Sequence, residues 1–170
     1  MTSDMESFFK RLDALDNGKR AALRRSYGIH LTKATGNALV AFYQCLPKGV
    51  PASMEDRWFT IACLRCLWDR GDDEKKPKRF EQIIAEMGKQ DDVSASMLHR
   101  LSLLLDVPWN SDAYLMGKLT RMIKMIRGKS ERAFVDFPAL LDDLLCWNAD
   151  DQYVQRRWAR TVYIELNEKK

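Results

Sequence analysis

Histidine, cysteine and paired acidic residues are the side chains of this sequence that could carry out catalysis or bind a metal ion. The two histidines, His30 and His99, lie on different predicted elements with no motif around either, so we expect neither to be a general base. Cys63 and Cys66 form a C-x-x-C inside the apolar run IACLRCLW. A zinc site needs about four ligands, and the sequence offers no second such pair and no suitably spaced histidines. We therefore interpret these cysteines as small buried apolar side chains.

Adjacent aspartates could in principle hold Mg²⁺. The candidate pairs are Asp72–Asp73, Asp91–Asp92 and Asp142–Asp143. Neighbouring residues on a helix diverge by about 100°, so such a pair cannot easily share one metal ion. The sequence also has no phosphate-binding loop, dinucleotide-binding glycine motif, zinc-protease motif or hydrolase nucleophile motif. We therefore predict that the protein is not an enzyme, with no catalytic residue, no metal and no cofactor.

Basic residues at helical spacing indicate a different chemistry, namely contact with phosphate. Between Ala113 and Ser130 there is no acidic residue, and the apolar side chains fall within a sector of roughly 120°. Four cations spread over the opposite side: Lys118, Arg121, Lys124 and Arg127. Like charges three residues apart repel each other unless an anion relieves them. We predict a surface that follows a phosphate backbone; the alternative is a basic face that pairs with acids of another helix.

Two further basic clusters lie near the ends of the chain. The segment GKRAALRRSYG contains Lys19, Arg20, Arg24 and Arg25, and the segment RRWAR contains Arg156, Arg157 and Arg160. Cations at a helix N-terminus are disfavoured by the macrodipole, which makes a docked anion beside Lys19 and Arg20 favourable. Arginine forks suit phosphate oxygens. The alternatives are a solvated side chain for Lys19 and, for the second cluster, ion pairs with Asp142, Asp143, Asp150 or Asp151.

The net charge is only mildly basic, so the distribution of charge has to support the prediction. The 28 lysines and arginines exceed the 24 acids by four, and the acids gather in other segments, which allows one strongly positive face. Most of the aromatic residues stand at apolar-face positions: Phe42, Trp58, Phe59, Trp68, Trp147 and Trp158. Core packing explains these rings better than base stacking. We therefore expect contact with the nucleic-acid backbone rather than stacking of bases.

Helices have to position these residues, because apolar side chains recur at helical spacing nearly everywhere and no segment predicts a strand. The first four expected helices cover about 4–16 and 19–28, then a helix that ends at Pro47 and a helix that begins at Ser53. The next three cover 80–87, 94–105 and a range from 110 or 111 to 127. A short eighth helix is capped by Asp136, and the last runs from 150 or 151 to about 166. The fourth has Asp56 as its capping-box acid and should be the most buried. We predict an all-α, compact bundle of about nine helices.

The 170 residues are expected to form a single helical domain, 1–170, and the alternative is two lobes of about 1–90 and 91–170. The charged segment 69–79 is expected to be an exposed loop or the junction between the two lobes.

No run approaches the ~20 apolar residues of a membrane helix, and the N-terminus lacks the features of a signal peptide. We therefore expect a cytoplasmic protein with no membrane partner.

An ordered set of segments resembles the CasB family, the small subunit of the type I-E CRISPR surveillance complex Cascade. These segments are LDALDNGKRAALRRSYG, FYQCLP, RWFTIACLRCLW, VDFPALLDDLLCWN and VQRRWARTVY, and their order and spacing hold across nearly the whole chain. The chain departs from the family at Phe137, where tryptophan is expected, and around Arg100, where the family is often richer in arginine.

The resemblance implies a helical, non-enzymatic subunit that binds guide RNA and the target and displaced DNA strands. It also implies two copies placed head to tail, in contact with the backbone and large subunits of Cascade, while a separately recruited helicase-nuclease cuts the target. By residue match, the family's nucleic-acid contacts fall on three groups: Arg24 with Arg25; Lys118, Arg121 and Lys124; and Arg156, Arg157 and Arg160.

Two other classes of function compete with this interpretation. A helical adaptor would meet only proteins, through acidic surfaces of its partners. A DNA-binding regulator would need Asn, Gln and Arg aimed at base edges, and the helix ending at Arg127 has no Asn or Gln. The backbone-binding prediction would fail if Arg25, Arg121 and Arg156 were each held by an internal carboxylate, with no connected positive surface.

Overall fold

The fold is all-α in the computed structural model, which describes residues 2–69, 75–90, 93–110 and 113–168. Nine α-helices and two short 3₁₀ helices, η1 and η2, occur in these ranges. They are α1 (Thr2–Asp13), α2 (Asn17–Arg25), η1 (Leu31–Lys33), α3 (Gly36–Cys45), η2 (Ala52–Met54), α4 (Glu55–Trp68), α5 (Phe80–Met87), α6 (Ser94–Leu105), α7 (Tyr114–Lys129), α8 (Phe137–Leu145) and α9 (Tyr153–Asn167). The pairing between Lys78 and Val135 is an isolated β-bridge within the described residues. The predicted all-α fold is confirmed.

Helix α4 is largely buried in the core, as its apolar run WFTIACLRCLW predicts. It is buried on nearly every side and contacts α2, α7 and α8. Cys63 and Cys66 are buried in it, which confirms that they are small core side chains. Burial raises the pKa of the Cys66 thiol to about 12, so the free thiol stays protonated near neutral pH, as fits a core side chain.

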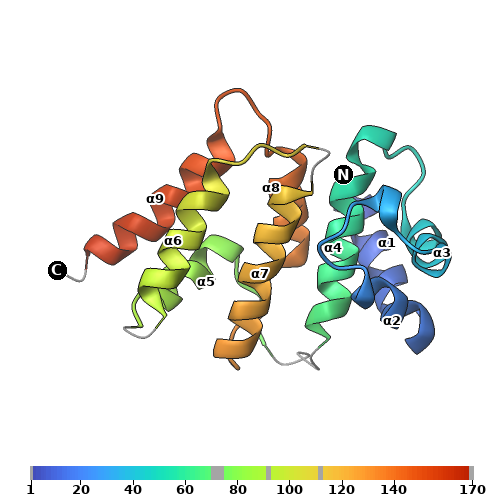
Figure 1. The fold of residues 1–170 in the computed structure, drawn as a ribbon, viewed down its shortest axis with the longest axis horizontal. Helices are drawn as coiled ribbons and strands as arrows, with labels where there is room; N and C mark the ends of the chain where they lie inside the picture. Colours follow the sequence, from blue (N-terminus) through green and yellow to red (C-terminus); the bar gives the residue numbers. More distant parts are fainter. Residues whose placement is uncertain (1, 70–74, 91–92, 111–112, 169–170) are drawn as a thin grey trace.

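The helices gather in two groups along the long axis of the molecule. Figure 1 shows α1–α4 at one end and α5, α6 and α9 at the other, with α7 and α8 between them. Helix α5 packs against α9, and α6 packs against both α5 and α7. One hydrophobic core runs through both groups in the described part of the chain, with Phe8 and Phe42 at one end and Trp147 and Trp158 at the other.

Several predicted helix ends are wrong because nearby polar side chains cap earlier or later positions. Helix α1 ends at Asp13 rather than residue 16, since Asp16 is the N-cap of α2 and accepts a hydrogen bond from the backbone N–H of Lys19 at 2.9 Å. The capping box predicted for Asp56 does not form. Its carboxylate instead accepts the backbone N–H of Leu31 and pairs with His30 at 2.7 Å. The predicted cap Asp136 is confirmed on α8, where it accepts the N–H of Ala139.

The remaining expected bounds differ by a few residues or fall outside the described residues. Helices α5 and α6 match their predicted ranges, and η1 lies between the second and third helices. Helix α4 begins at Glu55, α7 begins at Tyr114 and α9 begins at Tyr153. The aspartate pairs Asp72–Asp73 and Asp91–Asp92 lie outside the described residues, as does part of segment 69–79.

Candidate nucleic-acid interface

The exposed side of α7 carries three cations that have no acidic partner among the described residues, namely Lys118, Arg121 and Lys124. The predicted apolar face of this helix is buried, which turns the basic face outward. Arg121 is exposed and has no hydrogen-bond or ion-pair partner among the described residues. Lys118 lies 4.5 Å from the centre of the Tyr114 ring, and the Lys124 ammonium lies 4.2 Å from the centre of the Tyr27 ring. The acids of other helices, which the alternative prediction needed, therefore do not neutralise these three cations in the described structure.

Arg127 differs from the other cations of α7. Its Nε donates a hydrogen bond of 3.0 Å to the backbone carbonyl of Trp68 at the end of α4. The side chain is partly buried and ties two helices together. We therefore give Arg127 a packing role and base no part of the interface on it.

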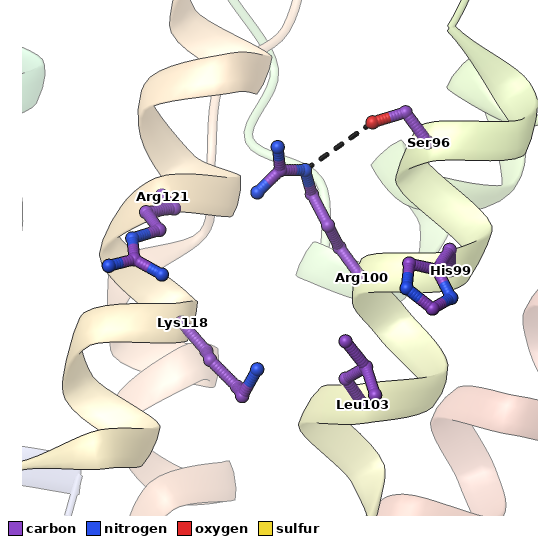
Figure 2. Close-up of a pocket in the computed structure, with 6 residues that line it drawn as sticks. All are labelled: Ser96, His99, Arg100, Leu103, Lys118 and Arg121. Carbon is purple, nitrogen blue, oxygen red and sulfur yellow. Dashed lines mark hydrogen bonds between the residues drawn. The ribbon is translucent and has the colours of Figure 1, made fainter.

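A groove lies between α6 and α7 and adds a cation to this surface. It has a volume of about 270 Å³ and is lined by Ser96, His99, Arg100, Leu103, Lys118 and Arg121. In Figure 2 the Arg100 side chain extends from α6 into the space that faces α7, and Lys118 extends from α7 toward α6. The Nε of Arg100 donates to the hydroxyl of Ser96 at 3.4 Å, a weak contact, and its charge has no acidic partner among the described residues. Two facing helices thus present three cations to one groove.

The cluster on α2 divides into two cations near its N-terminus that are engaged by carboxylates and two at its C-terminal end that are exposed. Arg20 is engaged inside the protein, since its guanidinium lies 2.7 Å from a carboxylate oxygen of Asp69 and 3.8 Å from one of Asp13. Burial acts to lower the pKa of Arg20, but the hydrogen bond and the charge of Asp69 outweigh burial and raise it overall. Lys19 pairs with its own cap, Asp16, at 3.6 Å. Arg20 is therefore a structural residue, and the helix N-terminus is satisfied internally.

The other two cations of α2 stand at its C-terminal end and face solvent. Arg24 is about half exposed and makes a long 3.8 Å contact with Asp69. Arg25 is exposed and has no partner among the described residues. The C-terminal end of α2 therefore offers two cations to an external anion.

The cluster on α9 divides in the same way. Arg157 is held by two buried carboxylates, with Nε donating to Glu81 at 3.1 Å and the terminal nitrogen donating to Asp143. Arg79 contacts the same two carboxylates, and the indole of Trp158 donates to Asp143. The alternative of an internal ion pair thus holds for Arg157. Arg156 and Arg160 are exposed and have no partner in the described part of the chain.

The turn that follows α2 joins two of the three clusters. Tyr27 comes two residues after Arg25, and its hydroxyl accepts a hydrogen bond of 3.0 Å from Lys124 of α7. The next residue, Gly28, has a φ of +74°, and a side chain there would meet Thr120 of α7. A connected row of cations therefore runs from Arg24 and Arg25, past Lys124, Arg121 and Lys118, to Arg100; we call it the basic track. Helix α9 packs against α5, and its two exposed arginines are not part of this track.

The sequence that builds this surface matches a known family over most of its length. The model of the family described as CRISPR-associated protein Cse2 matches residues 19–163. The chain belongs to the Cse2 family. This confirms the CasB resemblance, and solved CasB and Cse2 proteins share the fold.

Relatives of this Cse2-family chain agree in sequence and in structure. A CRISPR-associated protein Cse2 of Thermus thermophilus is 36% identical over 70 residues, which span 41% of this chain and 37% of that relative. The crystal structure of a Cse2-family protein from the same organism has a TM-score of 0.74 and 28% identity, covering 94% of this chain and 97% of the other. A chain in a structure of a CRISPR RNA-guided surveillance complex has a TM-score of 0.75 and 20% identity, covering 98% and 95%. The last comparison shows the shared fold alone.

Sequence reasoning missed two residues of this Cse2-family surface. Arg100 was noted only as a departure from the family, because a single arginine in an apolar segment gives no charge pattern. Its position one helical turn from Ser96 and Leu103 could have placed it on the outer side of α6. Tyr27 was missed because its contact with Lys124 joins residues 97 positions apart.

Residues considered for catalysis or metal binding have structural partners or stand apart. His30 caps η1 by accepting the N–H of Thr32 and pairs with Asp56, while His99 lines the rim of the α6–α7 groove. Among the residues that the structure describes, no group of three or more His, Cys, Asp or Glu side chains could hold a metal ion. No described helix is long and apolar enough to cross a bilayer.

Proposed function

We propose that this Cse2-family chain is the non-catalytic small subunit of a type I-E CRISPR surveillance complex. In that role it binds nucleic-acid backbone without sequence specificity and stabilises the guide RNA–target DNA hybrid and the displaced strand. The family membership supports this role, as does the likeness to a chain in a CRISPR RNA-guided surveillance complex. Exchange of a DNA duplex for an RNA–DNA hybrid is nearly balanced in free energy, so contacts to the backbone can decide it.

The single observation that carries the proposal is the basic track. Arg25 and Arg121 are exposed and have no acidic partner in the described part of the chain, and Lys124 and the Tyr27 turn connect them. Unpaired cations in a row suit a phosphate chain, because each contact adds affinity and releases counterions. Helix α7 contains no Asn or Gln, so it lacks the side chains that read adenine in the major groove. These features support binding that is indifferent to sequence.

The proposed partners are guide RNA, the target and displaced DNA strands, the backbone and large subunits of the complex, and a second copy of the chain. The proposed location is the cytoplasm. The alternative is an adaptor whose basic track meets acidic protein surfaces. Arg156 and Arg160 are a second exposed cation pair and could serve either role.

Gel shifts with unrelated single- and double-stranded DNA separate these functions. We expect the isolated protein to shift every sequence at low salt and to lose binding as salt rises. An absence of any shift at low salt would favour the adaptor, and a preference for one operator would favour a regulator. Genes for the other Cascade subunits and a repeat array are expected beside the gene for this chain.

A further inference from the structure

The tyrosines of this chain differ from its other aromatic residues in being exposed. The rings expected in the core are buried, which confirms their packing role. In contrast, all five tyrosines are at least 37% exposed: Tyr27, Tyr43, Tyr114, Tyr153 and Tyr163. An exposed ring costs the hydrophobic stabilisation that burial would give, so the positions of these rings need an explanation. Two of the five stand on the basic track.

Tyr114 stands at the start of α7, where the track meets the α6–α7 groove. Its side chain is 56% exposed, and Lys118 lies one turn further along the helix with its ammonium 4.5 Å from the ring centre. Tyr114, Lys118 and Arg121 are spaced four and three residues apart, so they share one side of the helix. An exposed ring is thus aligned with two cations that can hold phosphates.

Tyr27 stands at the other end of the same row of cations. Its side chain is 37% exposed, and Lys124 both lies 4.2 Å from the ring centre and donates to the hydroxyl. Gly28, the next residue, has a φ of +74°, and the hydrogen bond from Lys124 joins the turn to α7. The ring is therefore held in place, so the stacking of a base on it costs less conformational entropy than stacking on a mobile ring would. Tyr114 and Lys124 are ten residues apart, which separates the two rings by about 15 Å along the axis of α7.

We propose that the basic track takes an unpaired single strand, whose bases stack on Tyr27 and Tyr114 while its phosphates contact Arg121 and the two lysines. This rests on the proposed backbone-binding function and narrows its ligand to single-stranded nucleic acid. Proteins that bind single strands without sequence preference combine such a positive path with aromatic rings, because every base has a stacking face. A duplex keeps its bases stacked inside and would leave both tyrosines unused. The proposal adds base stacking to the backbone contact that the sequence favoured as the binding mode.

The other tyrosines supply matched controls. Tyr43 donates a hydrogen bond of 2.7 Å to Glu55, and this bond, with burial and the charge of Glu55, raises its pKa to about 12. An acid at that ring would repel phosphate. Tyr163 on α9 is 40% exposed, similar to Tyr27, and is absent from the basic track. Substitution of Tyr163 therefore tests the general effect of losing an exposed ring.

The test compares two oligonucleotides of equal length and equal charge, one of thymidines and one with abasic sites throughout. The full-length chain should bind the thymidine strand about tenfold more tightly than the abasic strand at the same salt concentration. Tyr27→Leu and Tyr114→Leu should each weaken binding of the thymidine strand and leave binding of the abasic strand nearly unchanged. Tyr27→Phe and Tyr114→Phe keep the ring and should preserve the preference, and Tyr163→Leu should behave as the parent protein does.

Each outcome distinguishes this inference from the function on which it rests. Equal affinity for both strands, with binding that weakens as salt rises, would overturn base stacking and leave backbone binding intact. Loss of the preference in Tyr163→Leu would overturn the placement of the strand on the track. An absence of binding to either strand at low salt would overturn the proposed function itself. Because both tyrosines are exposed, circular dichroism should show that the leucine variants remain folded.

Discussion

At the residue scale, the partner of each arginine decides its role. Arg25 and Arg121 are exposed and lack acidic partners in the described structure, whereas Arg20 and Arg157 are held by carboxylates. The sequence predicted which residues are basic and which helix face they occupy. It could not tell these two classes apart, because Arg20 meets Asp69 across 49 residues and Arg157 meets Glu81 across 76. Such pairings depend on how the helices pack, and helical periodicity does not report that.

The buried carboxylates that hold Arg157 give a stability prediction. Asp143 is 4% exposed and accepts hydrogen bonds from Arg79, Arg157 and Trp158. Asp143→Asn removes the negative charge that the guanidinium groups of Arg79 and Arg157 share. The substitution should therefore lower the free energy of unfolding by about 3 kcal/mol. For a chain of this size that corresponds to roughly 9 °C in Tm, measurable by thermal denaturation.

The neighbouring residue is the control for this substitution. Burial, followed by the charge of Asp143, raises the pKa of Asp142. A raised pKa means that the folded state disfavours the charged form, so stability is lost as pH rises through that pKa. Asp142→Asn should therefore raise Tm slightly at pH 7 and leave it unchanged near pH 3. A large loss of stability in this variant would contradict the account of the buried network.

At the scale of elements, periodicity predicted the helices well and their ends less well. The bounds of α5 and α6 match the prediction. The start of α4 was missed because Asp56 binds His30 and Leu31 across the fold instead of capping its own helix. Helix α2 was predicted over 19–28 but spans Asn17–Arg25. The contact of the turn that follows with α7 was not predicted, since it joins distant segments.

Gly28 tests whether that turn is fixed by its backbone. Its φ of +74° is disfavoured for any residue with a side chain, so Gly28→Ala should destabilise the protein by about 1 kcal/mol. Gly36 begins α3 and a Cβ there would meet nothing within 4 Å, so Gly36→Ala should be neutral or slightly stabilising. Chemical denaturation of the two variants measures the difference. Equal stability of both variants would show that the left-handed turn is not required.

At the scale of the whole molecule, a small net charge conceals a strongly positive surface. The chain carries a formal charge of only +4, yet internal ion pairs use the carboxylates and leave a row of cations exposed. The sequence predicted three basic clusters and a polarised surface. It could not predict that the clusters on α2 and α7 join while the one on α9 stands apart, because that depends on the packing of α2, α7 and α9.

The salt dependence of binding tests the central claim most directly. With about five phosphates engaged on single-stranded DNA, the logarithm of the association constant should fall against the logarithm of salt concentration with a slope near −3.5. Arg25→Gln combined with Arg121→Gln should reduce the slope to about −2.1, because each lost phosphate contact removes about 0.7. Lys10→Gln combined with Lys48→Gln removes the same charge from exposed positions outside the basic track and should leave the slope near −3.5. An unchanged slope in the arginine variant, or an equal reduction in the lysine control, would contradict the account.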